Sequence, residues 1–548
     1  MNQTVKIVIV GGVAGGMSAA TRARRCNEDA QITVLERGSY ISFANCGLPY
    51  YLDGRIAPKE KLLLTHPGAV ASRYKIDARV GQEVMTIDRP GKRVQVKDLL
   101  TSQTYWLAYD KLILAPGANA IVPPLPNIDA RNVFGVRSVD DIVAIEAYIQ
   151  SAGAKSVVIV GAGYIGLEMA DAMTSAGLSV TLLEKAADPM PMMDHDLVSL
   201  VREELQKHNV GLITGDGLAA LNGDGDRVRE VVTESGRRLP ADLVILSIGV
   251  RPNVSLAQSA GLQLGVTGAI QVDGYQRTSD PDIYAVGDAA EVTHGVTGLP
   301  ARIPLAGSAN RAGRLAGQHS ATGQSPAAGK VLGTAIVQVF DLAAGMTGLS
   351  ESAAIKAGFD ADSAYVLPTH HAGYYPDAQQ MRLKLVYDKP TGRILGAAAV
   401  GKAGVDKRID VIATVMHFGG TIDDLAQLDL AYSPQYGSAK DAVHFAAFVA
   451  QNQRDGFTPA VNPRFEVKDR FVLDVRTPGE YAKGAMPGAI NIPVDELRGR
   501  LGELPKDRAI LVTCQVGMRG HIATRILRQR GFDAVNLKGG YLMATASR

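Results

Sequence analysis

One local arrangement constrains the fold of this chain more than any other: a strand, a glycine-rich turn, a helix, a second strand and an acidic residue. It first occurs at the N-terminus. An apolar strand over residues 5–10 leads into a turn, a helical pattern follows over 17–25, and a strand over 31–35 ends at Glu36. The turn reads Gly11-Gly12-Val13-Ala14-Gly15-Gly16. Such a unit predicts two parallel strands with a helix packed against them.

The arrangement is then repeated. A strand over residues 156–160, a helix to about residue 176 and a strand over 179–183 surround a second turn, and Glu184 closes the unit. This turn reads Gly161-Ala162-Gly163-Tyr164-Ile165-Gly166. In both copies the acid follows the first glycine by 23–25 residues. Two such copies predict an α/β protein with two Rossmann-like dinucleotide-binding domains.

Each part of the arrangement has a role in binding a dinucleotide. Glycines allow a tight turn close to a pyrophosphate, the helix N-terminus offers N–H groups to it, and the acid accepts hydrogen bonds from ribose hydroxyls. Val13 replaces the usual middle glycine, so the first copy is less regular. Glu184 disfavours a 2′-phosphate and therefore favours NADH, although Lys185 directly after it leaves NADPH possible.

Length, net charge and cysteine content limit the kinds of partner and location that this chain can have. The chain has 548 residues, enough for several domains, and a net charge of +2, which argues against nucleic acid or an anionic membrane as the main partner. We find no apolar run that would span a bilayer, and the N-terminus is typical of a buried strand rather than a signal peptide. Three widely spaced cysteines, Cys26, Cys46 and Cys514, do not form a disulfide framework. We therefore expect a reducing, cytoplasmic location, and we predict no metal site.

Two further segments complete a family resemblance. Asp280-Pro281-Asp282-Ile283-Tyr284-Ala285-Val286-Gly287-Asp288 and Leu114-Ala115-Pro116-Gly117, taken with the two glycine turns, resemble the flavoprotein disulfide reductases over about residues 5–450. The resemblance implies that Asp288 holds the ribityl–phosphate chain of FAD and that Gly117 lies at the crossover between the FAD and NAD domains. It assigns these residues to cofactor binding: Gly11, Gly12, Ala14, Gly15, Glu36, Arg37, Gly117, Asp288 and Ala306 for FAD, and Gly161, Gly163, Tyr164, Ile165, Gly166 and Glu184 for NADH. Tyr164 resembles the family's gate over the flavin.

The same resemblance divides the chain into domains. We expect an FAD-binding domain in two parts, residues 1–118 and 250–329, around an NAD(P)H-binding domain at 119–249. An α+β dimerisation domain at 330–450, a polar linker at 451–463 and a C-terminal α/β domain at 464–548 follow. The interface domain implies a homodimer.

Cys46 lies in Ser42-Phe43-Ala44-Asn45-Cys46-Gly47-Leu48-Pro49-Tyr50. Many relatives have two cysteines at C-x4-C, but here Cys26 is twenty positions away, so Cys46 must exchange with a substrate thiol, a persulfide or its own sulfenic acid. The start of a helix would lower its pKa toward a thiolate. The motif resembles coenzyme A-disulfide reductases and related persulfide reductases, in which the single cysteine forms a mixed disulfide with coenzyme A.

This closer resemblance also suggests residues for coenzyme A. Ser42 and Asn45 match positions near its thiol end, and Arg22 and Arg25 match positions that hold its phosphates. Tyr374 and Tyr432 resemble tyrosines that the second subunit donates to the catalytic sulfur, where a hydroxyl could serve as a general acid. The neighbouring Tyr375 and Tyr436 remain alternatives for these two roles.

Cys514 lies in Thr513-Cys514-Gln515-Val516-Gly517-Met518-Arg519, between an apolar strand and a helix. Successive N–H groups and Arg519 would form an anion nest for a thiolate or persulfide. With the segments 473–481 and 488–493, this loop resembles the rhodanese family. Gln515 and Val516 replace the more frequent Arg and Ser, which puts thiosulfate in doubt as the donor.

Together these features predict an FAD-dependent, NADH-linked reductase of coenzyme A persulfide or polysulfide that releases hydrogen sulfide through Cys46, with Cys514 as a sulfane-sulfur carrier. Three alternatives remain. The substrate could be coenzyme A disulfide, with a regulatory rhodanese domain. The chain could be an NADH oxidase or peroxidase, although peroxidase relatives carry histidine where Ala14 stands. It could also serve mainly as a sulfurtransferase or redox sensor.

Overall fold

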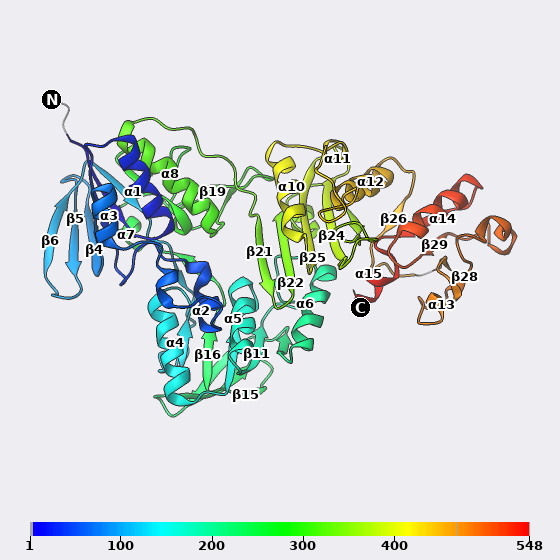
Figure 1. The fold of residues 1–548 in the computed structure, drawn as a ribbon, viewed down its shortest axis with the longest axis horizontal. Helices are drawn as coiled ribbons and strands as arrows, with labels where there is room; N and C mark the ends of the chain where they lie inside the picture. The colour runs from blue at the N-terminus through cyan, green and yellow to red at the C-terminus, as the bar shows by residue number, and fades with distance from the viewer. Residues whose placement is uncertain (1–3, 468, 547–548) are drawn as a thin grey trace. The chain divides into compact units, whose positions relative to one another are not determined.

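The computed structural model describes residues 4–467 and 469–546. Residues 1–3, 468 and 547–548, which belong to the expected first and last domains, lie outside the described residues. The chain forms two compact units (Figure 1). Unit 1 comprises residues 1–187 and 208–333, and unit 2 comprises 188–207 and 334–548. Residues 188–207, from the range expected for the NAD(P)H-binding domain, thus pack with unit 2.

The first half of unit 1 is built on a five-stranded parallel sheet of order β18-β7-β1-β2-β3. Its strands are β1 (Lys6–Val10), β2 (Gln31–Leu35), β3 (Ile76–Arg79), β7 (Lys111–Leu114) and β18 (Ile283–Ala285). A three-stranded antiparallel sheet accompanies it, formed by β4 (Gln82–Asp88), β5 (Arg93–Asp98) and β6 (Thr104–Ala108). Strand β18 returns to this sheet from far along the chain.

The second half of unit 1 has the same plan. Its parallel sheet has the order β12-β11-β10-β16-β9, with β9 (Val133–Gly135), β10 (Ser156–Val160), β11 (Ser179–Glu184), β12 (Gly211–Thr214) and β16 (Leu243–Leu246). The antiparallel sheet beside it contains β13 (Leu218–Gly223), β14 (Val228–Thr233) and β15 (Arg238–Pro240). The antiparallel strands β8 (Ala118–Ala120) and β17 (Val250–Pro252) join the two halves.

Successive residues of a strand point to opposite faces of the sheet. In the first parallel sheet the residues on both faces are buried. Ile7 and Ile9 pack into one core cluster with residues of helices α1 (Ala14–Cys26) and α8 (Ala306–Thr322), whereas Val8 packs into another with residues of β5 and β7. Helices α1 and α8 lie side by side (Figure 1). Their backbones approach so closely that a Cβ on Gly313 would lie 2.1 Å from the Gly15 carbonyl oxygen.

The remaining elements of unit 1 are short, apart from two helices of the second half. They are α2 (Leu48–Leu52), α3 (Pro67–Tyr74), α4 (Val139–Ala152), α5 (Tyr164–Ser175), α7 (Ser255–Ser259), the 3-10 turns η1 (Asn45–Gly47), η2 (Lys59–Leu62) and η3 (Gly287–Ala289), and the strand pair β19 (Val292–Thr293) and β20 (Pro300–Ala301). Helices α1 and α5 begin inside the glycine turns, at Ala14 and Tyr164. The helix predicted from residue 17 thus starts three residues earlier, because the last glycines of the turn form its first helical turn.

Unit 2 contains an antiparallel sheet of order β21-β22-β25-β24-β23. Its strands are β21 (Ala335–Val339), β22 (Leu342–Gly348), β23 (Ala361–Val366), β24 (Met381–Asp388) and β25 (Ile394–Gly401). Helices α6 (His195–Lys207), α9 (Glu351–Lys356), α10 (Val405–His417), α11 (Ile422–Ala426) and α12 (Ala442–Arg454) accompany it. Lys384, 3% exposed on β24, pairs with Asp194 at 2.9 Å and with Glu351 at 2.8 Å.

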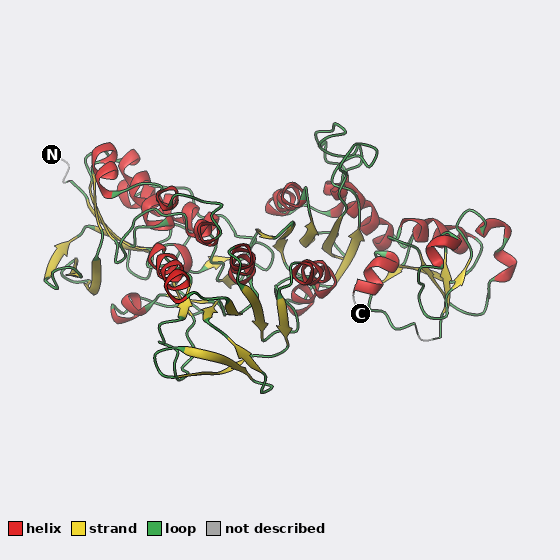
Figure 2. Cartoon of the chain, turned by 60° about the horizontal axis from the view of Figure 1, so that its bottom comes forward, coloured by secondary structure: helices red, strands yellow, loops and turns green. Residues whose placement is uncertain are grey.

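The C-terminal part of unit 2 is a smaller α/β domain, in which helices surround the strands (Figure 2). Its parallel sheet has the order β26-β30-β29-β27-β28, with β26 (Ala460–Val461), β27 (Phe471–Asp474), β28 (Ile490–Asn491), β29 (Ile510–Thr513) and β30 (Ala534–Leu537). The helical elements are α13 (Pro478–Tyr481), η4 (Leu497–Gly499), η5 (Leu501–Glu503), α14 (Met518–Gln529) and α15 (Gly540–Ala546). The predicted fold class is confirmed: two Rossmann-like sheets, an α+β domain and a C-terminal α/β domain. Across the described residues, we find no helix both long and apolar enough to cross a membrane.

Candidate active sites

The backbone conformation at the first glycine of each turn excludes other residue types. Gly11 has a φ of +98° and Gly161 a φ of +102°. A Cβ would lie 2.1 Å from the Ala115 carbonyl oxygen at Gly11, and 2.5 Å from the Ser247 carbonyl oxygen at Gly161. Both the dihedral angle and the neighbouring backbone therefore require glycine.

The last glycine of each turn is also fixed by backbone contact. A Cβ on Gly16 would lie 1.8 Å from the Gly11 carbonyl oxygen, and one on Gly166 would lie 1.9 Å from the Gly161 carbonyl oxygen. The middle position differs, since a Cβ on Gly163 would meet none of the described atoms within 4 Å. The protein itself therefore leaves room for Val13 at the equivalent place in the first turn.

The two acids occupy matching positions. Glu36 accepts hydrogen bonds from the N–H groups of Gly12 and Gly38, both at 2.7 Å. Glu184 accepts one from the Ala162 N–H at 2.7 Å and one from the Ala186 N–H at 2.8 Å. Each carboxylate has about four lone-pair positions, so both acids can still accept hydrogen bonds from ribose hydroxyls. Each acid is thus held at its turn by backbone N–H groups.

The helices after the glycine turns begin without help from side chains. Within the described structure, α1 and α5 have no side-chain cap and no acidic residue in the first turn. By contrast α4, α11 and α12 begin with capping boxes at Ser138, Thr421 and Asp441. Uncapped N–H groups beside a glycine turn suit a pyrophosphate, so these residues fit a dinucleotide in each half of unit 1.

The other predicted cofactor residues lie around these turns. Asp288 is in η3, and its carboxylate lies 3.5 Å from the guanidinium of Arg137. Gly117, with a φ of +69°, lies at the start of the connection between the two halves. Ala14 and Tyr164 begin α1 and α5, and Gly15 and Ile165 follow them directly. Ala306 begins α8, another helix without a side-chain cap in the described structure. Arg37 is exposed and lies 3.7 Å from Glu83.

Cys46 is held next to the first glycine turn. Ser42, four residues before it, has a φ of +48° and donates its N–H to the Gly12 carbonyl oxygen at 2.7 Å. Asn45 and Cys46 form η1 and are exposed. Cys26, Cys46 and Cys514 are all free thiols.

The predicted direction of the Cys46 pKa is wrong. Desolvation raises the pKa of its thiol, and the carboxylates of Glu168 and Asp288 raise it further. A backbone hydrogen bond in the turn lowers the pKa but is the smallest of these effects. Helix α2 is only five residues long, so its start cannot offset partial desolvation and two negative charges. The structure thus brings Cys46 within electrostatic range of Asp288 and of a helix that begins with Tyr164.

The predicted phosphate-binding arginines both lie near the end of α1. Arg22 donates hydrogen bonds from Nε and Nη2 to Gln318 Oε1 on α8, at 3.2 and 2.5 Å. Arg25 is exposed in the last turn of the helix. The first arginine is therefore oriented by α8, and the second faces solvent.

In unit 2 the hydroxyl groups of Tyr374 and Tyr432 lie 3.1 Å apart. Tyr375 instead packs edge-on against His371, with ring centroids 5.6 Å apart. Tyr436 is exposed in the same loop as Tyr432. The structure therefore brings together the hydroxyl groups of the two tyrosines chosen from the sequence, whereas the Tyr375 ring packs against His371.

A buried arginine holds the two tyrosine loops together. Arg408 on α10 is 2% exposed and donates to both carboxylate oxygens of Asp441, at 3.0 and 2.7 Å. The same guanidinium donates to the His370 carbonyl oxygen at 2.7 Å. Ala372 also donates its N–H to the Gly437 carbonyl oxygen at 2.9 Å. One cation thus connects the loop of Tyr374 with the segment that follows Tyr432.

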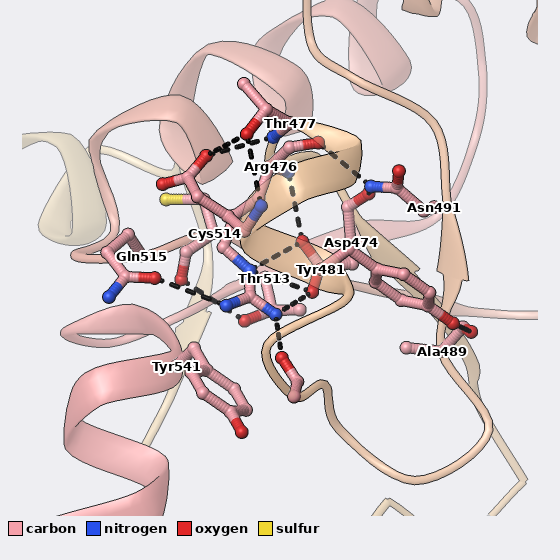
Figure 3. Close-up of polar contacts among 12 residues, drawn as sticks. Asp474, Arg476, Thr477, Tyr481, Ala489, Asn491, Thr513, Cys514, Gln515 and Tyr541 are labelled. Carbon is pink, nitrogen blue, oxygen red and sulfur yellow. Dashed lines mark hydrogen bonds and ion pairs between the residues drawn. The ribbon is translucent and has the colours of Figure 1, made fainter.

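Cys514 directly follows strand β29 and is 1% exposed (Figure 3). Gly517, with a φ of +99°, donates its N–H to the Cys514 sulfur at 3.1 Å, and helix α14 begins immediately after it. Helix α15 closes the other side, because Tyr541 donates its N–H to the Cys514 carbonyl oxygen at 2.7 Å. A backbone N–H of the loop therefore points at the sulfur, as N–H groups do in an anion nest.

Two arginines flank this loop, each paired with a carboxylate. Arg519 binds both carboxylate oxygens of Glu480, at 2.7 and 2.6 Å, and lies within electrostatic range of Cys514. Arg476 is buried against Asp474 and donates to Gln515 Oε1 at 3.2 Å (Figure 3). The sequence singled out Arg519 but not the carboxylate that orients it, nor the arginine that orients Gln515.

Comparison with protein families decides the identity of these folds. The model of the pyridine nucleotide-disulphide oxidoreductases matches residues 5–313. The chain belongs to the pyridine nucleotide-disulphide oxidoreductases. The dimerisation domain of the same family matches residues 334–443, and a rhodanese-like domain matches 461–543.

Relatives of this oxidoreductase share most of its length. It is 37% identical to the NAD(P)H sulfur oxidoreductase (CoA-dependent) of Pyrococcus abyssi, over 79% of this chain and 96% of that protein. The coenzyme A disulfide reductase of Staphylococcus epidermidis is 34% identical, over 81% of this chain and 100% of its own.

Solved structures extend the likeness to the C-terminal domain. The crystal structure of reduced Bacillus anthracis CoADR-RHD has a TM-score of 0.96 and 43% identity, covering 100% of this chain and 98% of that one. The NAD-dependent persulfide reductase from A. fulgidus has a TM-score of 0.93 and 38% identity, covering 98% and 99%.

The sequence interpretation of this oxidoreductase missed the residues that tie Cys46 to the second half of unit 1. Tyr50 on α2 donates to Glu168 Oε1 on α5 at 2.9 Å, and Tyr51 donates to Glu146 Oε2 on α4 at 2.8 Å. Arg55 pairs with Asp171 at 3.0 Å. The local signal for this link was the pair Tyr50-Tyr51 at the end of the cysteine motif.

Proposed function

We propose that this oxidoreductase uses NADH and FAD to reduce coenzyme A persulfide or a polysulfide, with release of hydrosulfide. The observation that carries the proposal is the position of Cys46. Its sulfur lies within electrostatic range of Asp288, from the first half of unit 1, and of Glu168 on the helix that begins inside the second glycine turn. A single free thiol between two nucleotide-binding turns suits electron transfer from a nicotinamide to a sulfur substrate.

FAD, when bound, supplies two-electron transfer between a nicotinamide and a sulfur atom. The first glycine turn, Glu36 and Asp288 would hold it, with Gly117 and Ala306 beside them. The second turn and Glu184 would hold NADH, since a carboxylate at that place disfavours a 2′-phosphate. The exposed Lys185 lies 2.8 Å from Glu234, so a carboxylate already pairs with the cation that would favour NADPH.

Cys46 performs the sulfur chemistry. Its thiolate attacks the inner sulfur of coenzyme A persulfide, a bond forms between the two sulfurs, and hydrosulfide leaves with the outer sulfur. The product is a disulfide between Cys46 and coenzyme A. Two electrons and one proton then convert this disulfide into the Cys46 thiolate and free coenzyme A thiol.

Residues around Cys46 would bind coenzyme A. Ser42 and Asn45 flank the thiol end, and Arg22 and Arg25 offer two positive charges to its phosphates. Tyr374 or Tyr432 of a second subunit would protonate a departing thiolate. We include a homodimer, a cytoplasmic location and the domain boundaries predicted from the sequence in this proposal.

Cys514 would deliver the sulfur that Cys46 removes. A sulfane sulfur on Cys514 would lie in the loop of backbone N–H groups near Arg519, which suits an anionic persulfide. Transfer of that sulfur to coenzyme A thiol would regenerate coenzyme A persulfide. The names of the Pyrococcus abyssi and A. fulgidus relatives support reduction of sulfur or persulfide substrates.

Replacement of single cysteines tests the proposal. Cys46→Ser should abolish NADH-dependent sulfide release, and Cys514→Ser should slow release from polysulfide but not from preformed coenzyme A persulfide. Cys26→Ser, at the end of α1, is the matched control and should leave both rates unchanged. Sulfide release by Cys46→Ser at the parental rate would contradict the proposal.

Reduction of coenzyme A disulfide is a second candidate, favoured by the name of the Staphylococcus epidermidis relative. The same Cys46 chemistry would then release coenzyme A thiol in place of hydrosulfide. Steady-state kcat/KM values for the disulfide and the persulfide on one enzyme preparation decide between them. Oxygen consumption without a sulfur acceptor separates both from an NADH oxidase.

A further inference from the structure

Lys538 is a buried cation of the C-terminal domain that the proposed mechanism does not use. It directly follows strand β30, and its side chain is 3% exposed. Its ammonium group donates a hydrogen bond to the carboxylate of Asp362 on β23, a strand of the antiparallel sheet in unit 2. The C-terminal domain and the antiparallel sheet are therefore joined by an ion pair whose cation is shielded from water.

The carboxylate that receives Lys538 is oriented by its own sheet. Tyr387 on β24 donates its hydroxyl to Asp362 Oδ2 at 3.3 Å, and the same hydroxyl lies 3.3 Å from Gln453 Oε1 on α12. A second hydrogen bond joins the two domains, because Asn462 Nδ2 donates to Glu351 Oε1 at 3.4 Å. The ion pair thus connects two surfaces that are each fixed by further bonds.

The residues directly after Lys538 complete the Cys514 loop. A Cβ on Gly540 would lie 2.4 Å from the Cys514 carbonyl oxygen and 2.8 Å from the Gly517 nitrogen. That nitrogen carries the N–H group that donates to the Cys514 sulfur. Tyr541, labelled in Figure 3, donates its own N–H to the Cys514 carbonyl oxygen at 2.7 Å. The backbone at residues 540–541 therefore limits where the N–H group that faces the sulfur can lie.

Little freedom remains between the ion pair and the loop. A Cβ on Gly539 would lie 2.2 Å from Met543 Cγ and 3.5 Å from Tyr365 Cβ on β23, so this peptide is packed between α15 and the antiparallel sheet. Tyr541 follows Lys538 by three residues, which is about 10 Å of fully extended chain. A displacement of Lys538 is therefore passed to the Cys514 loop rather than absorbed by a flexible segment.

We propose that Asp362 and Lys538 are positioning residues for Cys514, because their ion pair fixes residues 539–541 and so keeps the Gly517 N–H directed at the sulfur. This role rests on the proposed function of Cys514 as a sulfane-sulfur carrier. In the loading step the Cys514 thiolate attacks the end of a polysulfide chain and forms an S–S bond. The adjacent S–S bond of the polysulfide breaks, and the shortened polysulfide leaves with the bonding pair. The Gly517 N–H then faces a persulfide anion.

The test is the rate at which inorganic polysulfide loads Cys514 in the full-length flavoprotein, followed in a single turnover by mass analysis of the Cys514 peptide. Asp362→Asn and Lys538→Met each remove one charge and should slow loading about tenfold, because the loop is no longer held in place. Asp362→Asn also leaves a buried ammonium group without its partner, so this variant should unfold at a lower temperature. Lys538→Arg keeps the charge and should load at close to the parental rate.

The double variant separates position from stability. Asp362→Asn with Lys538→Met contains neither charge of the pair, so its unfolding temperature should return toward the parental value. Loading should stay as slow as in the slower single variant, because the directed bond is still missing. Loading at the parental rate in the double variant would overturn the proposal, since the pair would then matter for stability alone. Parental loading in both single variants would overturn it as well.

Asp360→Asn is the matched control. Asp360 directly precedes β23 and pairs with Lys389 at the surface, at 2.7 Å. This variant should load Cys514 at the parental rate, and a tenfold loss here would also contradict the proposal. Coenzyme A disulfide reduction, which uses Cys46 rather than Cys514, should be unchanged in every variant. Failure of the proposed carrier function gives a different result, because the parental protein itself would then acquire no sulfur on Cys514.

Discussion

The phenolic oxygens of Tyr374 and Tyr432 lie 3.1 Å apart although the residues are 58 positions apart in the chain. The buried Arg408–Asp441 pair holds their loops in register. Hydrogen bonding with Tyr432 raises the pKa of Tyr374, and we propose that the two hydroxyls act together as a proton donor. Both side chains are exposed in unit 2, as expected of residues offered to another subunit.

Removal of either hydroxyl should slow turnover. We expect Tyr374→Phe and Tyr432→Phe each to lower kcat about 100-fold, the scale of general acid catalysis. Because the hydroxyls bond to one another, the double variant should lose little more than the worse single variant. Tyr375→Phe and Tyr436→Phe are the controls, and a larger loss in either of them would reassign the role.

Glu184 should control the choice of nicotinamide. Glu184→Gln retains an acceptor for the Ala162 N–H but removes the charge that repels a 2′-phosphate, so the ratio of kcat/KM for NADPH over NADH should rise about tenfold. Glu36→Gln, the same change in the first turn, should leave this ratio unchanged and weaken flavin retention instead. A shift in the ratio for Glu36→Gln would mean that the two turns are assigned the wrong way round.

Gly540 should be essential for sulfur transfer alone. Its φ is +65°, and a Cβ there would lie 2.4 Å from the Cys514 carbonyl oxygen. Gly540→Ala should displace the Cys514 loop, destabilise the domain by about 1–3 kcal/mol and abolish persulfide formation on Cys514. Reduction of coenzyme A disulfide should persist. Gly531→Ala, at a φ of +83° with none of the described atoms within 4 Å, isolates the backbone strain and should keep sulfur transfer.

Glu480 predicts a pH dependence of stability. Hydrogen bonds from Arg519 lower the pKa of Glu480 from 4.5 to about 2. Since the folded value lies below the unfolded one, the pair stabilises the domain above about pH 4.5 and loses this effect as the pH falls toward 2. Thermal unfolding should show Glu480→Gln less stable at pH 7 by about 1 kcal/mol or less, because the pair is partly exposed.

The difference in stability between Glu480→Gln and the wild type should be smaller when thermal unfolding is measured at pH 3. Glu503→Gln, which breaks the exposed pair with Arg500, is the control and should not change sulfur transfer by Cys514. A constant difference at both pH values would show that the Glu480 carboxylate is not what stabilises the loop.

Local patterns predicted the nucleotide turns well, because their requirements are met within a few residues. Gly11, Gly161 and the two acids satisfy backbone constraints that the spacing alone implies. The helix starts were misplaced by three residues in the first copy, since the closing glycines are themselves helical. The association of residues 188–207 with unit 2 depends on tertiary packing, and no local signal marks it.

The electrostatics of Cys46 could not be predicted from its motif. Its pKa depends on Glu168 and Asp288, which are distant in sequence and act through space. The helix after the cysteine was expected to lower the pKa, but this helix is only five residues long and partial desolvation of the thiol raises the pKa. Ion pairs between residues far apart in the sequence, such as Arg408–Asp441, cannot be predicted from local motifs for the same reason.

The Cys514 loop can reach its final structure only after helix α15 has been synthesised. Tyr541 and Leu542 supply N–H groups to the carbonyl oxygens of Cys514 and Gln515, at 2.7 and 3.2 Å. Residues 540–546 must therefore be synthesised before the Cys514 loop can close. Both glycine turns and Cys46 are synthesised much earlier. A nascent chain stalled before Tyr541 would possess every part of unit 1 and still lack a finished Cys514 loop.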